Sequence, residues 1–235
     1  MFRGEHPELG RVVGNALVLA SDLGHPRTGS EHLLLALTRS GGTVAAVLAK
    51  RGATTTAVEQ AVCLAEPAGA GAAVDRDTLA ELGIGLAQLS HASGAALLDR
   101  PPPREPLFPL GVAEARRRCA QMNPPLGLDA QASYEASLRL ALARREREHR
   151  PQHLAFALLA LDPGAAWVLV TANVDTRALL TDLATAFPPP QLNPLLRAER
   201  RLGQLRRHHD IVRRYQHTTG RTPTASPTIA ALIND

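Results

Sequence analysis

The chain has 235 residues, a length that suits one domain or two small ones with a sizeable core. Hydrophobic residues make up 45% of it but aromatic residues only 3%, so the core must consist of Leu, Ala and Val, which favours packed helices over a β-sandwich. The net charge is +4 and Lys50 is the only lysine, so the arginine excess indicates codon bias rather than selection for phosphate binding.

Apolar residues at three- and four-residue steps predict a first helix that ends at Gly24, a residue suited to a left-handed C-terminal cap. A second helix follows with an apolar run that ends at Leu37, and a third ends at Gly52. Thr54 is suited to cap a fourth helix, and Pro67 closes the set. The apolar face of the first helix comprises Leu9, Val12, Val13, Ala16, Leu17, Ala20 and Leu23.

The chain also resembles itself, because a shift of 121 residues aligns 8–67 with 129–188 without a gap. Several aligned pairs are chemical equivalents: Gly and Asn both tolerate a left-handed cap, and Thr and Asp both cap helix N-termini. We therefore predict an all-α fold with two copies of a four-helix unit that pack about a pseudo-two-fold axis. The matching positions include His32 with His153, Gly52 with Asn173, and Thr54 with Asp175.

These patterns divide the chain into a first copy (1–67), an insert (68–127), a second, degenerate copy (128–188) and a basic tail (189–235). The insert begins with an Ala/Gly-rich link, and helices are expected at Leu79–Leu98 and Val112–Met122, separated by prolines. The insert is either a lid or a mobile connector. The tail has a partial helical stripe, and Thr218–Pro227 looks flexible.

Several motifs carry a resemblance to a known family. The residues are MF at the start, RVV at Arg11–Val13, GH at Gly24 and His25, GSEHLLLAL at Gly29–Leu37 and VAA at Val44–Ala46. They look like the N-terminal repeat domain of Clp-type unfoldases, nearest the ClpC branch. The runs LGIGL at Leu82–Leu86 and ALLDR at Ala96–Arg100 resemble an insert of stand-alone members. The second copy resembles the second repeat of that family more weakly.

The resemblance implies a domain that receives adaptors and substrates before ATPase rings act on them. In the ClpC branch, an acidic residue at the start of the second helix recognises phosphorylated arginine, and cyclic peptide antibiotics bind beside the first helix. By resemblance these roles fall on Ser30 and Glu31, and on an edge formed by Phe2 and Val13. A carboxylate suits a guanidinium fork, and free helix N–H groups suit a phosphate. In the second copy, Pro151 and Gln152 replace Ser30 and Glu31.

Structural readings compete with these functional ones. Glu31 would complete a capping box with Thr28 in a T-x-x-E pattern. His32 and His153 are expected to be packed and hydrogen-bonded rather than catalytic. His149 precedes a helix that starts at Pro151, so His149 and His153 would not share a helix face as a metal pair.

No nucleophile constellation is visible around the cysteines. Cys63 lies on a predicted core helix, and Cys119 follows an arginine run that would lower a thiol pKa but is usually a solvated face. The sequence contains no phosphate-cradling G-x-x-x-x-G-K-[ST] loop. With two cysteines, no signal peptide and no long apolar run, we expect a soluble, cytoplasmic protein with no membrane segment, cofactor, metal or catalytic residue.

The leading hypothesis is a non-enzymatic module that binds protein or peptide clients, Clp adaptors, a Clp unfoldase or cyclic peptides, and so modulates Clp-dependent proteolysis. The alternative is a nucleic-acid-associated regulator that acts through the arginine-rich tail, which also carries Tyr215. Glu199 and Asp210 interrupt the basic run, so a solvated or partner-binding helix is favoured over nucleic-acid binding.

Overall fold

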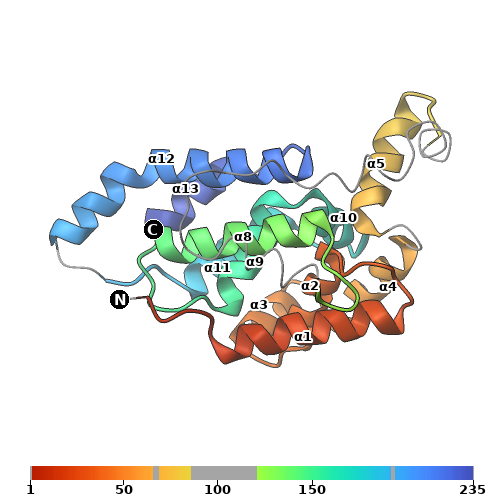
Figure 1. Ribbon diagram of the computed structural model, residues 1–235, viewed down its shortest axis with the longest axis horizontal. Helices are drawn as coiled ribbons and strands as arrows, with labels where there is room; N and C mark the ends of the chain where they lie inside the picture. The colour runs from red at the N-terminus through yellow and green to blue at the C-terminus, as the bar shows by residue number, and fades with distance from the viewer. Residues whose placement is uncertain (1, 66–68, 86–120, 192–193, 235) are drawn as a thin grey trace.

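The computed structural model describes residues 2–65, 69–85, 121–191 and 194–234, and Figure 1 shows that these residues form an all-α structure. Two sets of four helices make up its body, and an additional helix, α5, follows the first set. Two helices, α12 and α13, complete the chain. The bounds are α1 (Pro7–Asp22), α2 (Ser30–Arg39), α3 (Thr43–Lys50), α4 (Thr55–Ala65), α5 (Ala70–Glu81), α8 (Leu128–Ala143), α9 (Pro151–Leu161), α10 (Pro163–Thr171), α11 (Thr176–Ala186), α12 (Pro194–Thr219) and α13 (Ser226–Asn234).

The predicted duplication is confirmed at the level of single helices. Shifting α1 and α4 by 121 residues gives the bounds of α8 and α11. The caps correspond as well: Gly52 has a φ of +87° and Asn173 a φ of +58°. Thr54 accepts a hydrogen bond from the backbone of α4, as Asp175 does from that of α11. The two copies therefore start and stop their helices at the same places and with equivalent chemistry.

The two copies also contact each other reciprocally. Glu5 pairs with His149 in a short parallel bridge, and Thr28 pairs with Leu126 in another. When the first copy is shifted by 121 residues, Glu5 aligns with Leu126 and Thr28 aligns with His149. Each bridge is therefore the counterpart of the other. Such exchange of partners is what a two-fold relation requires. The predicted pseudo-two-fold packing is therefore present in the backbone.

The core lies where α2 and α9 meet between the outer helices. The apolar runs Leu33–Leu37 and Leu154–Leu161 have no solvent exposure, so both helices are buried all round rather than on one stripe. Leu and Ala dominate this core, as the composition predicts. Among the described residues, no single helix is long and apolar enough to cross a membrane; two consecutive pairs reach that length only together, and they are bent by 101° and 86°.

The insert differs from expectation where it is described. The Ala/Gly-rich link contains α5, and this helix ends at Glu81, whereas a helix over Leu79–Leu98 was expected. The prediction is wrong for residues 82–85, and the remainder of that stretch lies outside the described residues, as does most of Val112–Met122. Alanine-rich α5 forms because Ala has the highest helix propensity, and it packs chiefly against α10.

The tail is part of the fold, which corrects its reading as a solvated helix, whereas partner binding by the tail stays a prediction. Helix α12 packs along α8, where it buries Ile211 and Tyr215. The matching surface of α8 is built from small residues: Ala132 and Ala136 stand where α1 has the exposed Arg11 and Asn15. Because alanines allow a helix to approach closely, α12 covers the second copy and leaves the first open.

Helix α13 seals the other side of the second copy. Its Ile229, Leu232 and Ile233 are buried in the core. Buried Arg144 donates to the backbone oxygens of Leu232 (2.7 Å) and Phe187 (2.6 Å), so one side chain ties α13 to the end of α11. The segment between α12 and α13, expected to be flexible, is held to α9 by a hydrogen bond from the Ala225 N–H to the Ala160 oxygen at 2.8 Å.

Candidate functional site

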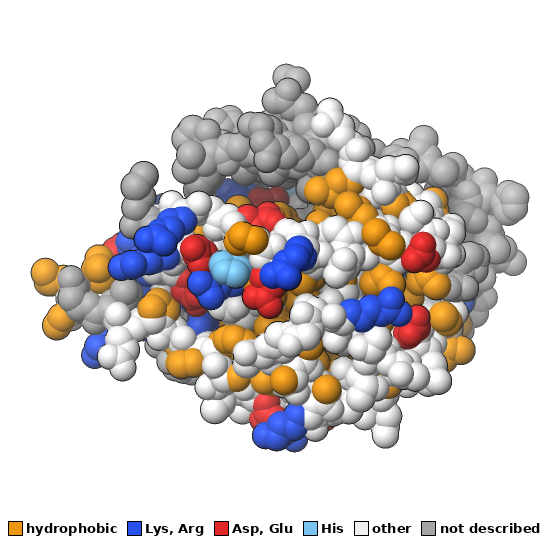
Figure 2. All heavy atoms as spheres, turned by 90° about the horizontal axis from the view of Figure 1, so that it is seen from below, with side chains coloured by type: hydrophobic (Ala, Val, Ile, Leu, Met, Phe, Trp, Pro, Cys, Tyr) orange, Lys and Arg blue, Asp and Glu red, His pale blue; other side chains and the backbone are white. Residues whose placement is uncertain are grey.

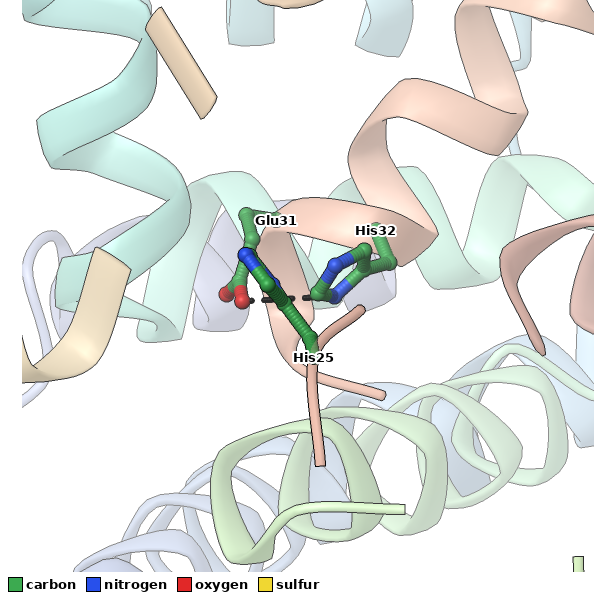
Figure 3. Close-up of side chains that lie close together, drawn as sticks. All are labelled: His25, Glu31 and His32. Atoms are coloured by element: carbon green, nitrogen blue, oxygen red, sulfur yellow. Dashed lines mark ion pairs between the residues drawn. The ribbon is translucent and has the colours of Figure 1, made fainter. Parts of the chain in front are cut away.

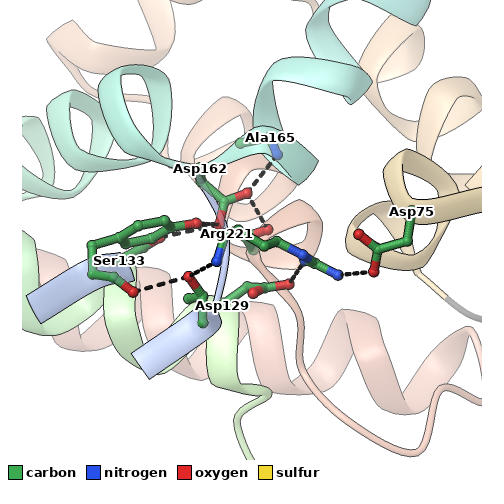
Figure 4. Close-up of polar contacts among 9 residues, drawn as sticks. Asp75, Asp129, Ser133, Asp162, Ala165 and Arg221 are labelled. Atoms are coloured by element: carbon green, nitrogen blue, oxygen red, sulfur yellow. Dashed lines mark hydrogen bonds and ion pairs between the residues drawn. The ribbon is translucent and has the colours of Figure 1, made fainter. Parts of the chain in front are cut away.

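The helix N-termini of α2 and α10 meet in a buried polar junction centred on Asp162 (Figure 4). Asp162 precedes Pro163 and caps α10, because its carboxylate accepts from the Ala165 N–H at 2.7 Å. The same carboxylate accepts from Ser30 Oγ at 2.7 Å and from the Tyr215 hydroxyl at 2.8 Å. The junction thus joins the first copy, the second copy and the tail.

Arg221 lies at the edge of this junction, between two further carboxylates. Its guanidinium donates to Asp75 on α5 and to Asp129 at the start of α8 (Figure 4). Burial raises the pKa of Asp129 to about 6, and the nearby Asp162 charge adds to the rise, while Arg221 opposes it. Arg221 therefore joins α5 to the second copy through charge-assisted hydrogen bonds.

Glu31 lies on the other side of Ser30, and only 4% of it is exposed. Burial raises its pKa to about 7, and this rise is opposed by backbone N–H groups at Glu31 itself and at Ala70, the first residue of α5. The carboxyl is so close to the backbone that a Cβ atom at Gly29 would lie 2.3 Å from Oε1, and one at Gly69 3.0 Å from it. Two glycines therefore make room for a carboxyl that faces the N-terminus of α5.

His32 and His25 stand beside Glu31 in a buried group (Figure 3). His32 Nδ1 accepts from the Gly29 N–H at 2.9 Å, so the ring caps its own helix. With Nδ1 accepting and burial lowering the His32 pKa to about 4, the ring is neutral and its proton is on Nε2. His153 makes the equivalent bond to the Arg150 N–H at 3.0 Å.

The recurrence of this bond in both copies identifies it as a helix cap, which confirms that His32 and His153 are packed and hydrogen-bonded. It also argues against a metal at His25, Glu31 and His32, because the His32 nitrogen nearest Glu31 is already an acceptor for backbone. The capping box predicted between Thr28 and Glu31 is wrong. The cap residue is Gly29, and the Thr28 hydroxyl donates to the Pro124 oxygen at 3.2 Å.

The four residues assigned by resemblance fall in different environments. Ser30 and Glu31 come together in the buried junction, beneath α5. Val13 is buried on the core side of α1, and Phe2 is half-buried near the start of the chain. The face of the molecule on the α1 side shows hydrophobic side chains interspersed with charged ones (Figure 2).

Sequence reasoning missed most of the residues that surround Ser30 and Glu31. Asp162 had a readable signal, since Asp before Pro is typical of a helix cap followed by the first helical residue. Tyr215 and Arg221 had none, because they reach the junction from the tail across a large separation in sequence. Cys63 also differs from expectation: it lies on α4, but its side chain is exposed.

Many tail arginines are paired within the chain. Asp210 accepts from Arg214 at 2.9 Å, and Glu199 accepts from Arg207 at 3.1 Å. Arg145 also donates to Glu199. These pairs reduce the net positive charge that α12 presents, which weakens the nucleic-acid alternative.

Comparison with known proteins gives one family match. Residues 7–91 match the family described as the Clp repeat (R) N-terminal domain. A search of curated proteins gave no match. Among solved structures, the chain is similar to the N-terminal domain of the caseinolytic protease associated chaperone ClpD from Arabidopsis thaliana, at 16% identity and a TM-score of 0.49, covering 79% of this chain and 96% of that one.

Proposed function

We propose, from the match of residues 7–91 to the Clp repeat (R) N-terminal domain family, that the protein is a non-enzymatic, Clp-related module that binds proteins or peptides. Its partners are clients, adaptors, a Clp unfoldase or cyclic peptides, and binding them modulates Clp-dependent proteolysis. The observation that carries the proposal is the unequal start of α2 and α9. Ser30 and Glu31 stand in the first copy where the second has Pro151 and Gln152.

Access to Ser30 and Glu31 requires α5 to move. This helix buries only Ala70, Gly71 and Ala73, so little apolar surface holds it in place. Polar contacts add to this packing: Asp75 accepts from Arg221, and Asp77 accepts from the Trp167 indole N–H at 2.8 Å. Opening α5 therefore exchanges a few polar contacts for water and exposes only two alanines, Ala70 and Ala73, from the edge of the core.

An opened site has the chemistry that phosphorylated arginine needs. Once α5 no longer buries it, the desolvation that raises the Glu31 pKa is relieved, so the carboxyl ionises more readily and offers two oxygens to a guanidinium. The N-terminus of α2 provides backbone N–H groups and a favourable dipole for an attached phosphate. Phe2 lies at a different edge, where the Arg3 N–H donates to the Arg147 oxygen at 2.7 Å, and there it supplies a separate apolar contact for a cyclic peptide.

The test compares the wild type with Asp75→Asn, which removes the α5 partner of Arg221, and with the near-isosteric Glu31→Gln. Calorimetric titrations would use free phosphoarginine, a ClpC-binding cyclic peptide and purified ClpC. We expect phosphoarginine to bind Asp75→Asn more tightly than wild type, and the double variant with Glu31→Gln to lose this binding. If none of the three ligands binds the wild type or Asp75→Asn, the proposal is wrong.

A further inference from the structure

Helix α12 has two faces of opposite character, and the one that packs on the protein is largely polar in its first half. Arg200 is buried and donates to the Pro190 oxygen at 3.3 Å. Gln204 donates to the Ala230 oxygen of α13 at 2.5 Å. Only further along, at Ile211 and Tyr215, does this inner face become apolar and enter the core.

The outer face of the first half carries leucines instead. Leu195, Leu202 and Leu205 are 82%, 87% and 66% exposed. They belong to a stripe with alternating steps of three and four residues, the repeat by which one helix packs on another. We call this stripe the leucine seam; it comprises Leu195, Ala198, Leu202, Leu205 and His209, and it ends there because the next position of the repeat, Val212, packs against the core.

The position of the seam makes it accessible. The first half of α12 extends past the end of α8 in Figure 1. An amphipathic helix normally turns its apolar stripe to the protein and its polar residues to water, and here that order is reversed. Leucines exposed in a row at helix-packing spacing indicate an interaction surface rather than scattered surface residues.

The charges beside the seam indicate the kind of partner. The positions that flank this stripe hold Arg201, Arg206 and Arg213, together with His208 and one acidic residue, Glu199. Glu199 is paired with Arg145 and Arg207, and Arg213 stays 79% exposed although it pairs with Asp210, so the flanks are predominantly basic. A second copy of α12 packed in parallel would place Arg201 opposite Arg206 of the other copy, which is unfavourable. An acidic helix would place carboxylates there, which is favourable.

A cavity of about 770 Å³ between α8 and α12 borders the C-terminal end of the seam. Arg206, Arg213 and Leu142 line it, and Leu142 is 44% exposed. The apolar and basic character of the seam therefore continues onto α8.

We propose that the leucine seam docks an acidic amphipathic helix of another protein. Apolar residues of that helix pack on Leu195, Leu202 and Leu205, and its Glu or Asp side chains meet Arg201, Arg206 and Arg213. This surface lies on the tail, away from Ser30 and Glu31, so it is independent of the function proposed above. It gives the tail a role besides covering the second copy.

The test uses two synthetic three-heptad peptides with leucine at the packing positions, one with glutamate and one with lysine at the flanking positions. Fluorescence anisotropy of the full chain with each peptide would be measured. We expect the glutamate peptide to bind and the lysine peptide to fail. Leu202→Gln with Leu205→Gln should weaken binding about tenfold or more, as should Arg206→Glu with Arg213→Glu.

Because all four side chains are exposed, these variants should keep the wild-type circular dichroism spectrum and melting temperature. Leu64→Gln, at a leucine of 66% exposure on α4, is the matched control and should bind normally. The inference is overturned if both peptides bind equally, if the leucine substitutions leave binding unchanged, or if a DNA duplex displaces the glutamate peptide. It is also overturned if light scattering finds a dimer that the leucine substitutions dissociate.

Discussion

Asp162 concentrates at one residue the interactions that join three parts of the chain. Its carboxylate is fully buried and accepts from Ser30, from the Ala165 backbone and from Tyr215. A buried carboxylate is tolerated only when its oxygens are satisfied in this way. The cost of removing any one donor is therefore larger than the average for a hydrogen bond.

Replacing Tyr215 by Phe tests the cost of removing one donor to Asp162, because the substitution deletes only a hydroxyl group. The ring stays, but the Asp162 carboxylate loses a buried donor, so we expect a loss of about 1.5–3 kcal/mol in the free energy of unfolding. Urea denaturation at neutral pH measures it. The matched control is Tyr134→Phe, whose hydroxyl donates to Glu5 at the exposed surface and should matter much less. Equal losses of unfolding free energy in the two variants would show that the buried donor to Asp162 contributes no more than an exposed one.

The raised pKa of Glu31 predicts a pH dependence with a definite sign. The carboxyl titrates near 4.5 in the unfolded chain and near 7 in the folded one. Between these values the folded state keeps a proton that the unfolded state has lost, so this carboxyl's stabilising contribution is complete below about pH 4.5 and is lost as the pH rises to about 7. Glu31→Gln removes this titration. The stability of the variant relative to wild type should therefore increase progressively from about pH 4.5 to about pH 7.

The expected gain of Glu31→Gln relative to wild type is about 3 kcal/mol between about pH 4.5 and about pH 8. Denaturant titrations at several pH values measure it. The lowered pKa of His32 acts in the opposite direction in both proteins, so the comparison between them isolates Glu31. A difference between the two proteins that does not vary with pH would show that Glu31 is ionised in the folded state.

The polar start of α2 could be read from the sequence, but its surroundings could not. Ser, Glu and His before an apolar run are a local signal for a helix N-terminus. The side chain that caps this helix depends on backbone angles, which the sequence does not determine. The capping bond is made by the His32 ring to the Gly29 N–H, and the expected pair of Thr28 and Glu31 does not form it. The partners of Ser30 and Glu31 come from α5, α10 and the tail, and no local pattern links those segments.

At the scale of helices, the backbone φ angle, and not the space around the residue, determines how a glycine-to-alanine substitution changes stability. Gly14 in α1 and Gly52 after α3 both have open space where a Cβ would go, but only Gly52 has a positive φ. We expect Gly14→Ala to stabilise the protein by about 0.5–1 kcal/mol, since Ala favours helix. Gly52→Ala should cost about 1–2 kcal/mol through left-handed strain.

Thermal unfolding of the two variants beside wild type checks this pair. The opposite signs are the prediction, because both substitutions add the same methyl group. If both variants shifted the melting temperature in the same direction, the assignment of Gly52 as a left-handed cap would be contradicted.

The eight repeat helices were predictable because, in each copy, the capping residues and the spacing of apolar residues indicate the same helix bounds. Helix α12 was only partly predictable. Its Ile211 and Tyr215 face the core, but Ala132 and Ala136 of α8 look like ordinary helix formers until the partner helix is seen to need their small size. The sequence did contain one signal for this packing. Where α1 has Arg11 and Asn15, α8 has alanines, which indicates that this face of α8 is covered.

At the scale of the whole molecule, the tail belongs to the folding unit. Ending the chain at Thr219 removes Ile229, Leu232 and Ile233, whose burial contributes about 1.5–3 kcal/mol each. The sum is comparable to the total stability of a typical domain, about 5–15 kcal/mol. We therefore expect the shortened chain to lose cooperative thermal unfolding, with loss of hydrogen-exchange protection in α9.

Leu195→Ala in the full chain is the control, because that side chain is exposed and its removal should leave unfolding unchanged. A shortened chain that melts at the wild-type temperature would contradict the prediction and place the stability of the second copy in its own four helices.

The reciprocal bridges at Glu5 with His149 and Thr28 with Leu126 have a consequence for how the two halves differ. Two identical molecules that associate in this way must present the same surfaces, because any change in one appears in the other. Joining the halves in one polypeptide removes that constraint, since each half then mutates alone. The second copy has alanines where the first has outer polar residues, and α12 covers it. The first copy has the polar helix start at Ser30 and Glu31, so a single chain with two copies holds a difference between its halves that no symmetric pair of identical molecules can have.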